Sequence, residues 1–143
     1  MQTTPVDTLN ELLRGEISAV ETYRQALEKL TNSPARAELE DCRRSHEVRV
    51  QKLREQVVRL GGRPDDSSGA WGAFAKLVEG GAKVFGEKAA IAALEEGEDR
   101  GLRLYKGDID KLDPASRALI EADVLPAQER THRSLSTLKH SMH

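Results

Sequence analysis

The sequence predicts an all-α protein, an antiparallel four-helix bundle made of two repeated helical hairpins joined by a long crossover with a short helix. Three observations support this. Apolar residues recur at helical spacing along four long segments. Capping residues, prolines and glycines fall at the ends of these segments. The first two segments also resemble the last two. The 143 residues form one domain, 1–143, which is large enough to bury a core.

The first hairpin consists of helices at about 5–31 and 34–60. Thr4 and Asp7 have the spacing of a capping box, and a proline occupies the first helical position between them. Ser33 is expected to cap the second helix in the same way. That helix ends at a Gly-Gly pair, a common C-terminal signal. The short connection predicts that the two helices are antiparallel.

Residues 61–86 differ from the helices on either side. They begin as a loop rich in Gly, Ser and Asp, and a short helix is expected within them. The segment is too long for a tight turn, so it predicts a crossover between the hairpins. Its aromatic residues Trp71, Phe74 and Phe85 are expected to pack against the core or to contact a second copy in a homodimer.

The second hairpin consists of helices at about 87–112 and 114–140. Asp113 is expected to cap the last helix, with a proline at the next position. Pro126 lies inside this helix, where it removes one backbone hydrogen bond and predicts a kink.

A single polar residue interrupts the apolar stripe of three helices: Glu16, His46 and Glu98. Burying a carboxylate or an imidazole costs several kcal/mol unless it is paired or bound to metal. Three such residues at equivalent heights predict a polar site inside the bundle. Gly97 and Gly101 lie one turn apart, which favours a close helix approach beside it.

The two hairpins can be aligned. The first helix of each contains Gly-Glu-x6-Tyr, and the second helices are related through a Ser-His and a Thr-His pair. The equivalent pairs in this alignment are Glu16 and Glu98, Tyr23 and Tyr105, His46 and His132, and Arg43 and Glu129.

This pattern resembles the ferritin and rubrerythrin superfamily, in which alternate helices supply a Glu and then a Glu-x-x-His pair to a di-iron centre. The Gly-Glu-x6-Tyr motif is especially similar to rubrerythrins, and the whole chain resembles a bacterial ferritin-like family of uncharacterised function. The resemblance implies one set of metal ligands: Glu16, His46, Glu98, Glu129 and His132. Tyr23 and Tyr105 would then be neighbours of the metal.

The second bridging carboxylate of that pattern falls on Arg43, which cannot ligate a metal. Three arrangements therefore remain open. The first is a full two-metal site, with Glu47 or Glu95 as further candidate ligands. The second is a single divalent ion held by Glu129, His132 and other carboxylates. The third is a metal-free network in which Arg43 pairs with a buried glutamate.

Two functions follow from these alternatives. The chain is expected either to bind iron or another divalent metal, for metal handling or for chemistry on dioxygen or peroxide, or to be a metal-free degenerate bundle that acts as a structural or protein-interaction module with an unidentified partner. The net charge of −2, with acidic and basic residues interleaved, gives no basic face for nucleic acid. No segment predicts a membrane span, and no secretory signal is seen, so the cytoplasm is the expected location.

Overall fold

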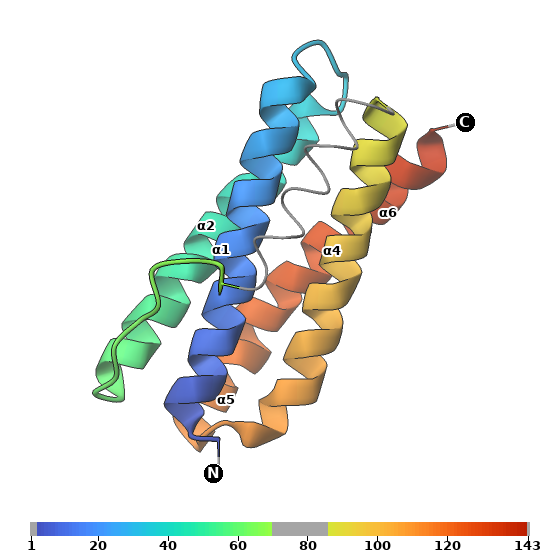
Figure 1. The fold of residues 1–143 in the computed structure, drawn as a ribbon. Coiled ribbons are helices and arrows are strands. Elements are labelled where there is room, and N and C mark those ends of the chain that lie inside the picture. Colours follow the sequence, from blue (N-terminus) through green and yellow to red (C-terminus); the bar gives the residue numbers. More distant parts are fainter. Residues whose placement is uncertain (1–2, 70–85, 143) are drawn as a thin grey trace.

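The computed structural model describes residues 3–69 and 86–142 (Figure 1). The long helices are α1 (Pro5–Lys29), α2 (Arg36–Arg59), α4 (Glu87–Asp108) and α6 (Leu125–Ser141). No strand occurs in the described residues. The four helices form a bundle in which α1 packs mainly on α2, α4 packs mainly on α6, and α1 lies beside α4. The predicted all-helical fold with four long helices is confirmed.

The starts of the first two helices differ in how they are capped. At α1 the capping box forms as expected, since the Asp7 N–H donates to Thr4 Oγ1 at 3.1 Å and the Thr4 N–H donates to the Asp7 carboxylate at 3.2 Å. Ser33, in contrast, does not cap α2. Its hydroxyl accepts from the Ala35 N–H at 3.0 Å within the connecting turn, and the helix begins only at Arg36. The predicted start at residue 34 is therefore two residues early.

The predicted glycine stop of α2 is present. The Gly61 N–H donates to the Val58 carbonyl and the Gly62 N–H to the Val57 carbonyl, both at 2.9 Å, which is the hydrogen-bond pattern of a Schellman motif. Gly61 has a φ of 81°, a left-handed conformation that costs glycine little. This motif ends the helix and turns the chain away from its axis.

The segment predicted as one helix over 114–140 is built from three pieces. Asp113 caps α5 (Pro114–Leu119), with its carboxylate accepting from the Ser116 N–H at 3.2 Å. A π-helical turn, Ile120–Val124, then leads directly into α6.

The π-helical turn has a local cause. Pro126 lacks an N–H, and in a regular α-helix its ring would clash with the carbonyl of Ala122. The wider turn relieves this clash, and the Leu125 N–H bonds to the carbonyl of Ile120, five residues earlier. The disturbance expected at Pro126 is thus a π-helical turn that accommodates roughly one extra residue.

A polar layer near the middle of the bundle separates two apolar clusters. The first cluster includes Leu27, Leu39, Ile91 and Leu135, and the second includes Leu9, Leu53, Ile120 and Val124. Both clusters receive side chains from α1, α2 and the second half of the chain. The predicted short crossover helix and the aromatic residues Trp71, Phe74 and Phe85 lie outside the described residues.

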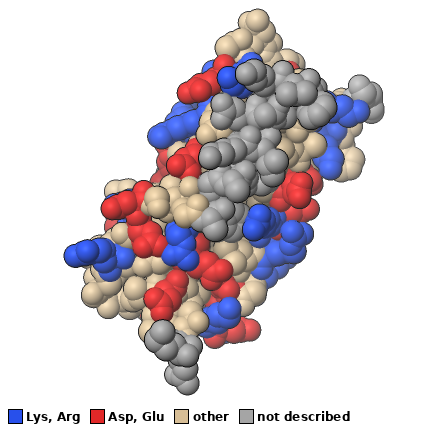
Figure 2. All heavy atoms as spheres, viewed as in Figure 1, with Lys and Arg blue, Asp and Glu red and all other residues tan. Residues whose placement is uncertain are grey.

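The surface carries charges of both signs. Lys and Arg side chains are interleaved with Asp and Glu side chains over the face seen in Figure 2. Within residues 3–69 and 86–142, no helix combines the length and the apolar character needed to cross a membrane.

Candidate functional site: a buried network of charges

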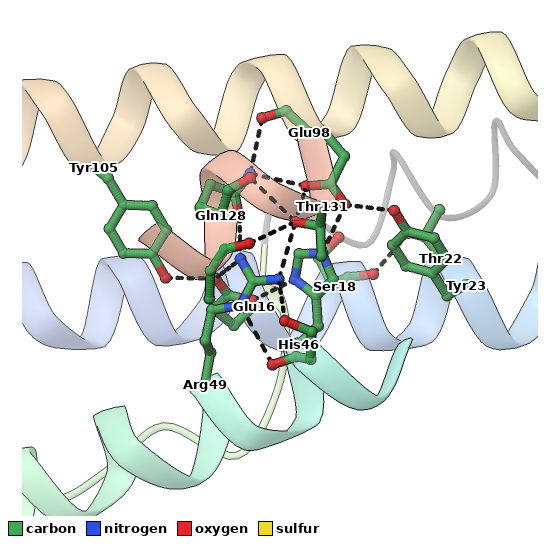
Figure 3. A network of polar contacts seen from close by, with 12 residues as sticks. Glu16, Ser18, Thr22, Tyr23, His46, Arg49, Glu98, Tyr105, Gln128 and Thr131 are labelled. Carbon is green, nitrogen blue, oxygen red and sulfur yellow. Dashed lines mark hydrogen bonds and ion pairs between the residues drawn. The ribbon is translucent and has the colours of Figure 1, made fainter. Parts of the chain in front are cut away.

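His46 lies between two carboxylates at the centre of the bundle (Figure 3). Its Nδ1 is 2.5 Å from Glu16 Oε1, and its Nε2 is 2.7 Å from Glu98 Oε2. Glu16 comes from α1 and Glu98 from α4, so the imidazole of α2 connects three helices. Because both ring nitrogens face carboxylate oxygens, both are expected to donate, which requires the doubly protonated, cationic ring.

Arg49, one turn after His46 on α2, is the second cation of the network. Its side chain is only 1% exposed. Its Nη1 lies 3.4 Å from Glu16 Oε2 and also donates to Gln128 Oε1. Its Nη2 donates to Thr131 Oγ1 at 3.1 Å and to Ser45 Oγ at 3.2 Å. The guanidinium therefore spans the space between α1, α2 and α6.

Two tyrosines exchange hydrogen bonds between α1 and α4. Tyr23 of α1 donates its hydroxyl proton to Glu98 of α4, and Tyr105 of α4 donates to Glu16 of α1. Both tyrosine rings are buried in apolar clusters, and the ring of Tyr23 also lies against the imidazole of His46, with ring centroids 5.3 Å apart. The hydroxyl hydrogen bonds satisfy the polar tip of each ring while its body packs in the core.

Neutral side chains of α6 donate further hydrogen bonds to Glu98. The Gln128 amide donates to Glu98 Oε1 at 3.1 Å and to the Glu98 backbone carbonyl at 2.8 Å. Thr131 donates to Glu98 Oε1 at 2.7 Å. Gly101 permits this approach, because a Cβ there would lie 2.8 Å from the Gln128 amide nitrogen. The close approach expected at Gly101 therefore occurs, between α4 and α6.

Mutual attraction outweighs burial in setting the charges of this network. Burial and Arg49 lower the pKa of His46, but Glu98 and Glu16 raise it by a larger amount. The pKa of His46 is therefore above its usual value. Burial raises the pKa of Glu98, yet His46 and Arg49 hold it at about 2. The pKa of Glu16 is likewise lowered, with Arg49 and His46 overcoming burial. Two anions and two cations then sum to zero.

The neighbouring hydroxyl and thiol groups remain protonated. Burial and the adjacent carboxylates raise the pKa values of Tyr23 and Tyr105 well above the usual 10, so both act as donors. Burial, together with Glu98, raises the pKa of Cys42 to about 12. Cys42 is therefore a packed thiol rather than a reactive one.

A cavity of about 30 Å³ lies beside the network between α1 and α4. Its lining includes Glu16, His46 and Glu98 together with the small residues Gly15 and Gly97. This volume holds about one or two water molecules.

The residues predicted for the site fall into two groups. Glu16, His46 and Glu98 meet in the interior, with both predicted tyrosines. The remaining predicted residues lie outside the network: Arg43, Glu47, Glu95, Glu129 and His132. Arg43 pairs with Glu47 at 2.8 Å, so it is not the cation that accompanies the buried glutamates. His132 instead contacts Asp99 and approaches Glu95 on the outer side of α4 and α6.

Of the side chains bonded to Glu16 or Glu98, three were not predicted: Arg49, Gln128 and Thr131. A constant separation of 82 residues relates the two halves of the network, as between Arg49 and Thr131. The same separation connects Glu16 with Glu98, Tyr23 with Tyr105, and His46 with Gln128. The predicted alignment used a separation of 82 residues between the first helices of the two pairs. Between the second helices it used a separation of 86 residues, as from His46 to His132. Keeping 82 throughout would have placed Gln128 and Thr131 inside.

The fold and the network define the class of this protein as a four-helix bundle with a buried, charge-balanced polar centre. The sequence matches the family model described as "Domain of unknown function (DUF2383)" over residues 4–111, and the chain belongs to this family. The match covers α1, α2 and α4, which supply both carboxylates and both cations of the network. No curated protein and no solved structure matches the chain.

Proposed function

We propose that this protein is a ferritin-like bundle in which protein cations, rather than metal ions, neutralise the buried carboxylates. We further propose that it acts as a structural or protein-interaction module. The observation that carries the proposal is the position of Arg49. Its guanidinium reaches Glu16, Gln128 and Thr131, so a cation already occupies the space into which further metal ligands from α2 and α6 would have to project.

The donor set supports this proposal. Two metal ions in a ferritin-like centre require four carboxylates and two imidazoles, whereas the interior offers Glu16, Glu98 and one imidazole. The carboxylates also face opposite nitrogens of His46, so one ion cannot bind both of them and the ring together. A divalent cation would further have to enter beside Arg49, which repels it.

Hydrogen bonding in the network is complete without a further ligand. Among the described residues, the buried side-chain atoms that lack a partner belong to residues outside the network: Thr8, Gln25, Asp108 and Asp113. Between them, the two carboxylates accept hydrogen bonds from side chains of α1, α2, α4 and α6. A buried site that awaited a ligand would leave some of these groups unpaired.

A structural role follows from which helices the network joins. His46 connects α2 to α1 and α4, and Arg49 connects α2 to α1 and α6. A shift of any helix along its neighbour would separate these buried charges at a cost of several kcal/mol. The network thus fixes the relative heights of the helices. The outer surface then remains for a protein partner or a second copy of the chain.

Metal analysis tests the proposal directly. Protein purified without chelator should contain no stoichiometric metal that depends on Glu16 or Glu98, and addition of Fe(II) in air should produce no absorbance from an oxo-bridged iron pair. Stoichiometric iron that is lost in Glu98→Gln would overturn the proposal and favour the metal-handling alternative.

A gain-of-function variant provides the matched positive control. The four substitutions His46→Glu, Arg49→His, Gln128→Glu and Thr131→His install a Glu-x-x-His pair on both α2 and α6. If the bundle is a degenerate ferritin-like fold, this variant should bind two ions per chain while the wild type binds none in its interior. Circular dichroism with and without metal separates failure to bind from failure to fold.

A further inference from the structure

We infer that Glu95, Asp99 and His132 form a surface site for one divalent transition-metal ion that connects α4 to α6. Glu95 and Asp99 lie one turn apart on α4, and His132 faces them from α6. His132 Nε2 is 2.5 Å from Asp99 Oδ1 and 4.0 Å from Glu95 Oε2. One ligand atom from each residue lies within 4.8 Å of the other two. This site is separate from the interior network and goes beyond the proposed function.

The equivalent place in the other half of the bundle is apolar. The residues 82 positions earlier are Leu13, Ile17 and Val50. Leu13 belongs to the second apolar cluster, and the other two pack against it. One pair of helices is thus joined at this point by hydrophobic contact, whereas the other presents three metal-ligating side chains. All three positions are therefore polar in one half of the bundle and apolar in the other.

The spacing of the three ligand atoms suits a small ion. Zinc binds imidazole nitrogen and carboxylate oxygen at about 2.0–2.2 Å, which places neighbouring ligands of a tetrahedral ion roughly 3.4 Å apart. The observed separations of 2.5 and 4.0 Å lie on either side of this value. Small rotations of half-buried side chains would therefore admit an ion, with water in the remaining position.

Neighbouring groups hold the Glu95 carboxylate in place. Ser136 donates to its Oε2 at 3.1 Å, and Lys139 lies 3.5 Å from its Oε1. The ammonium therefore lies on the oxygen away from His132 and leaves Oε2 directed toward the site. Two carboxylates neutralise a divalent ion, and the imidazole favours zinc, copper, nickel or iron over magnesium, calcium or manganese.

Zinc titration of the full, chelator-treated chain tests this inference. Calorimetry should give one ion per chain, and the melting temperature should rise with zinc because the ion binds only the folded pair of helices. His132→Gln and Asp99→Asn should each weaken zinc binding at least about tenfold. Circular dichroism without zinc checks that both variants are folded.

His140→Gln is the matched control. His140 is an exposed histidine on α6, and its Nδ1 lies 2.6 Å from the backbone carbonyl oxygen of Ser136. Its substitution should leave zinc binding unchanged. Absence of zinc binding, or binding that survives His132→Gln, would overturn the inference. Binding that is lost in His46→Gln but kept in His132→Gln would instead place the ion in the interior and contradict the proposed function as well.

Discussion

The α1–α2 pair and the α4–α6 pair occupy equivalent places in the bundle but contribute differently to its centre. Their first helices, α1 and α4, each supply a glutamate and a tyrosine, and each tyrosine donates to the glutamate of the other helix. Their second helices differ. Helix α2 supplies His46 and Arg49, whereas α6 supplies Gln128 and Thr131.

Equivalent sequence positions in the two halves thus carry an unequal distribution of charge. Both anions come from equivalent positions, but both cations come from α2. The two glutamates consequently accept hydrogen bonds from different sets of donors. Glu98 accepts from His46, Tyr23 and both polar residues of α6, while Glu16 relies on His46, Tyr105 and a long contact to Arg49. The following predictions test that inequality.

Removal of Arg49, one of the two cations on α2, should have the largest effect. Arg49→Met leaves two buried carboxylates with one positive partner, and breaking a buried ion pair in this way costs about 3–5 kcal/mol. The control is Arg43→Met on the same helix, which removes a partly exposed pair with Glu47 and should cost under about 1 kcal/mol. Urea denaturation measures both. Equal losses in the two variants would contradict the central role of Arg49.

Stability should also depend on pH with a maximum between about 4.5 and 6.5. The folded pKa of Glu98, about 2, lies below the unfolded 4.5, so its contribution is present above pH 4.5 and is lost as the pH falls toward 2. This loss is on the order of 3 kcal/mol.

The alkaline side of the same profile reports on His46. Its folded pKa is raised above 6.5, so its contribution is complete below pH 6.5 and is lost as the pH rises through the raised value. Urea denaturation across this range measures both limbs. His46→Gln should flatten the alkaline limb and Glu98→Gln the acid limb. Unchanged slopes in these variants would contradict the assigned charges.

The two tyrosines should not be equivalent. Tyr105→Phe removes one of the few donors to Glu16, and loss of a hydrogen bond to a buried charge costs about 1.5–3 kcal/mol. Tyr23→Phe should cost less, because Glu98 retains three other side-chain donors. Thermal unfolding of the two variants, which remove the same atom, compares the halves directly. A larger loss in Tyr23→Phe would reverse the proposed inequality.

A pair of glycines on α4 should give the smallest effects, with opposite signs. Ala at Gly101 would displace the Gln128 amide from Glu98, and this should outweigh the gain in helix propensity by about 1–2 kcal/mol. Gly107→Ala meets open space and should stabilise the protein by up to about 1 kcal/mol. Stabilisation in both variants would show that Gln128 moves aside at little cost.

Local signals predicted the helices well because caps and stops act within a few residues. The Thr4 capping box, the Asp113 cap and the glycine stop after α2 all form as expected. The predicted cap at Ser33 was wrong, because the Ser33 hydroxyl accepts a hydrogen bond within the turn before α2. The helix therefore begins at Arg36. Such competition between turn and cap is decided by backbone geometry that the sequence alone does not reveal.

Only part of the interior network was predicted, and the reason is not local backbone geometry. Glu16, His46 and Glu98 stand out because each interrupts an apolar stripe. Arg49 did not stand out, since an arginine on a charged helix ordinarily belongs to the surface. The register of α6 was also obscured, because the π-helical turn breaks the regular spacing that would connect α5 to Gln128.

The π-helical turn has a consequence for how this chain tolerates insertions and deletions. If the residues of α6 continued from α5 as a regular helix, each would rotate by about 100°, and Ala127 and Arg130 would replace Gln128 and Thr131 in the centre. Deleting one residue from Ile120–Val124, with Pro126 replaced by alanine, would instead restore a regular helix and keep the present residues inside. Loss of one residue from this turn, together with loss of Pro126, would thus leave Gln128 and Thr131 facing the network.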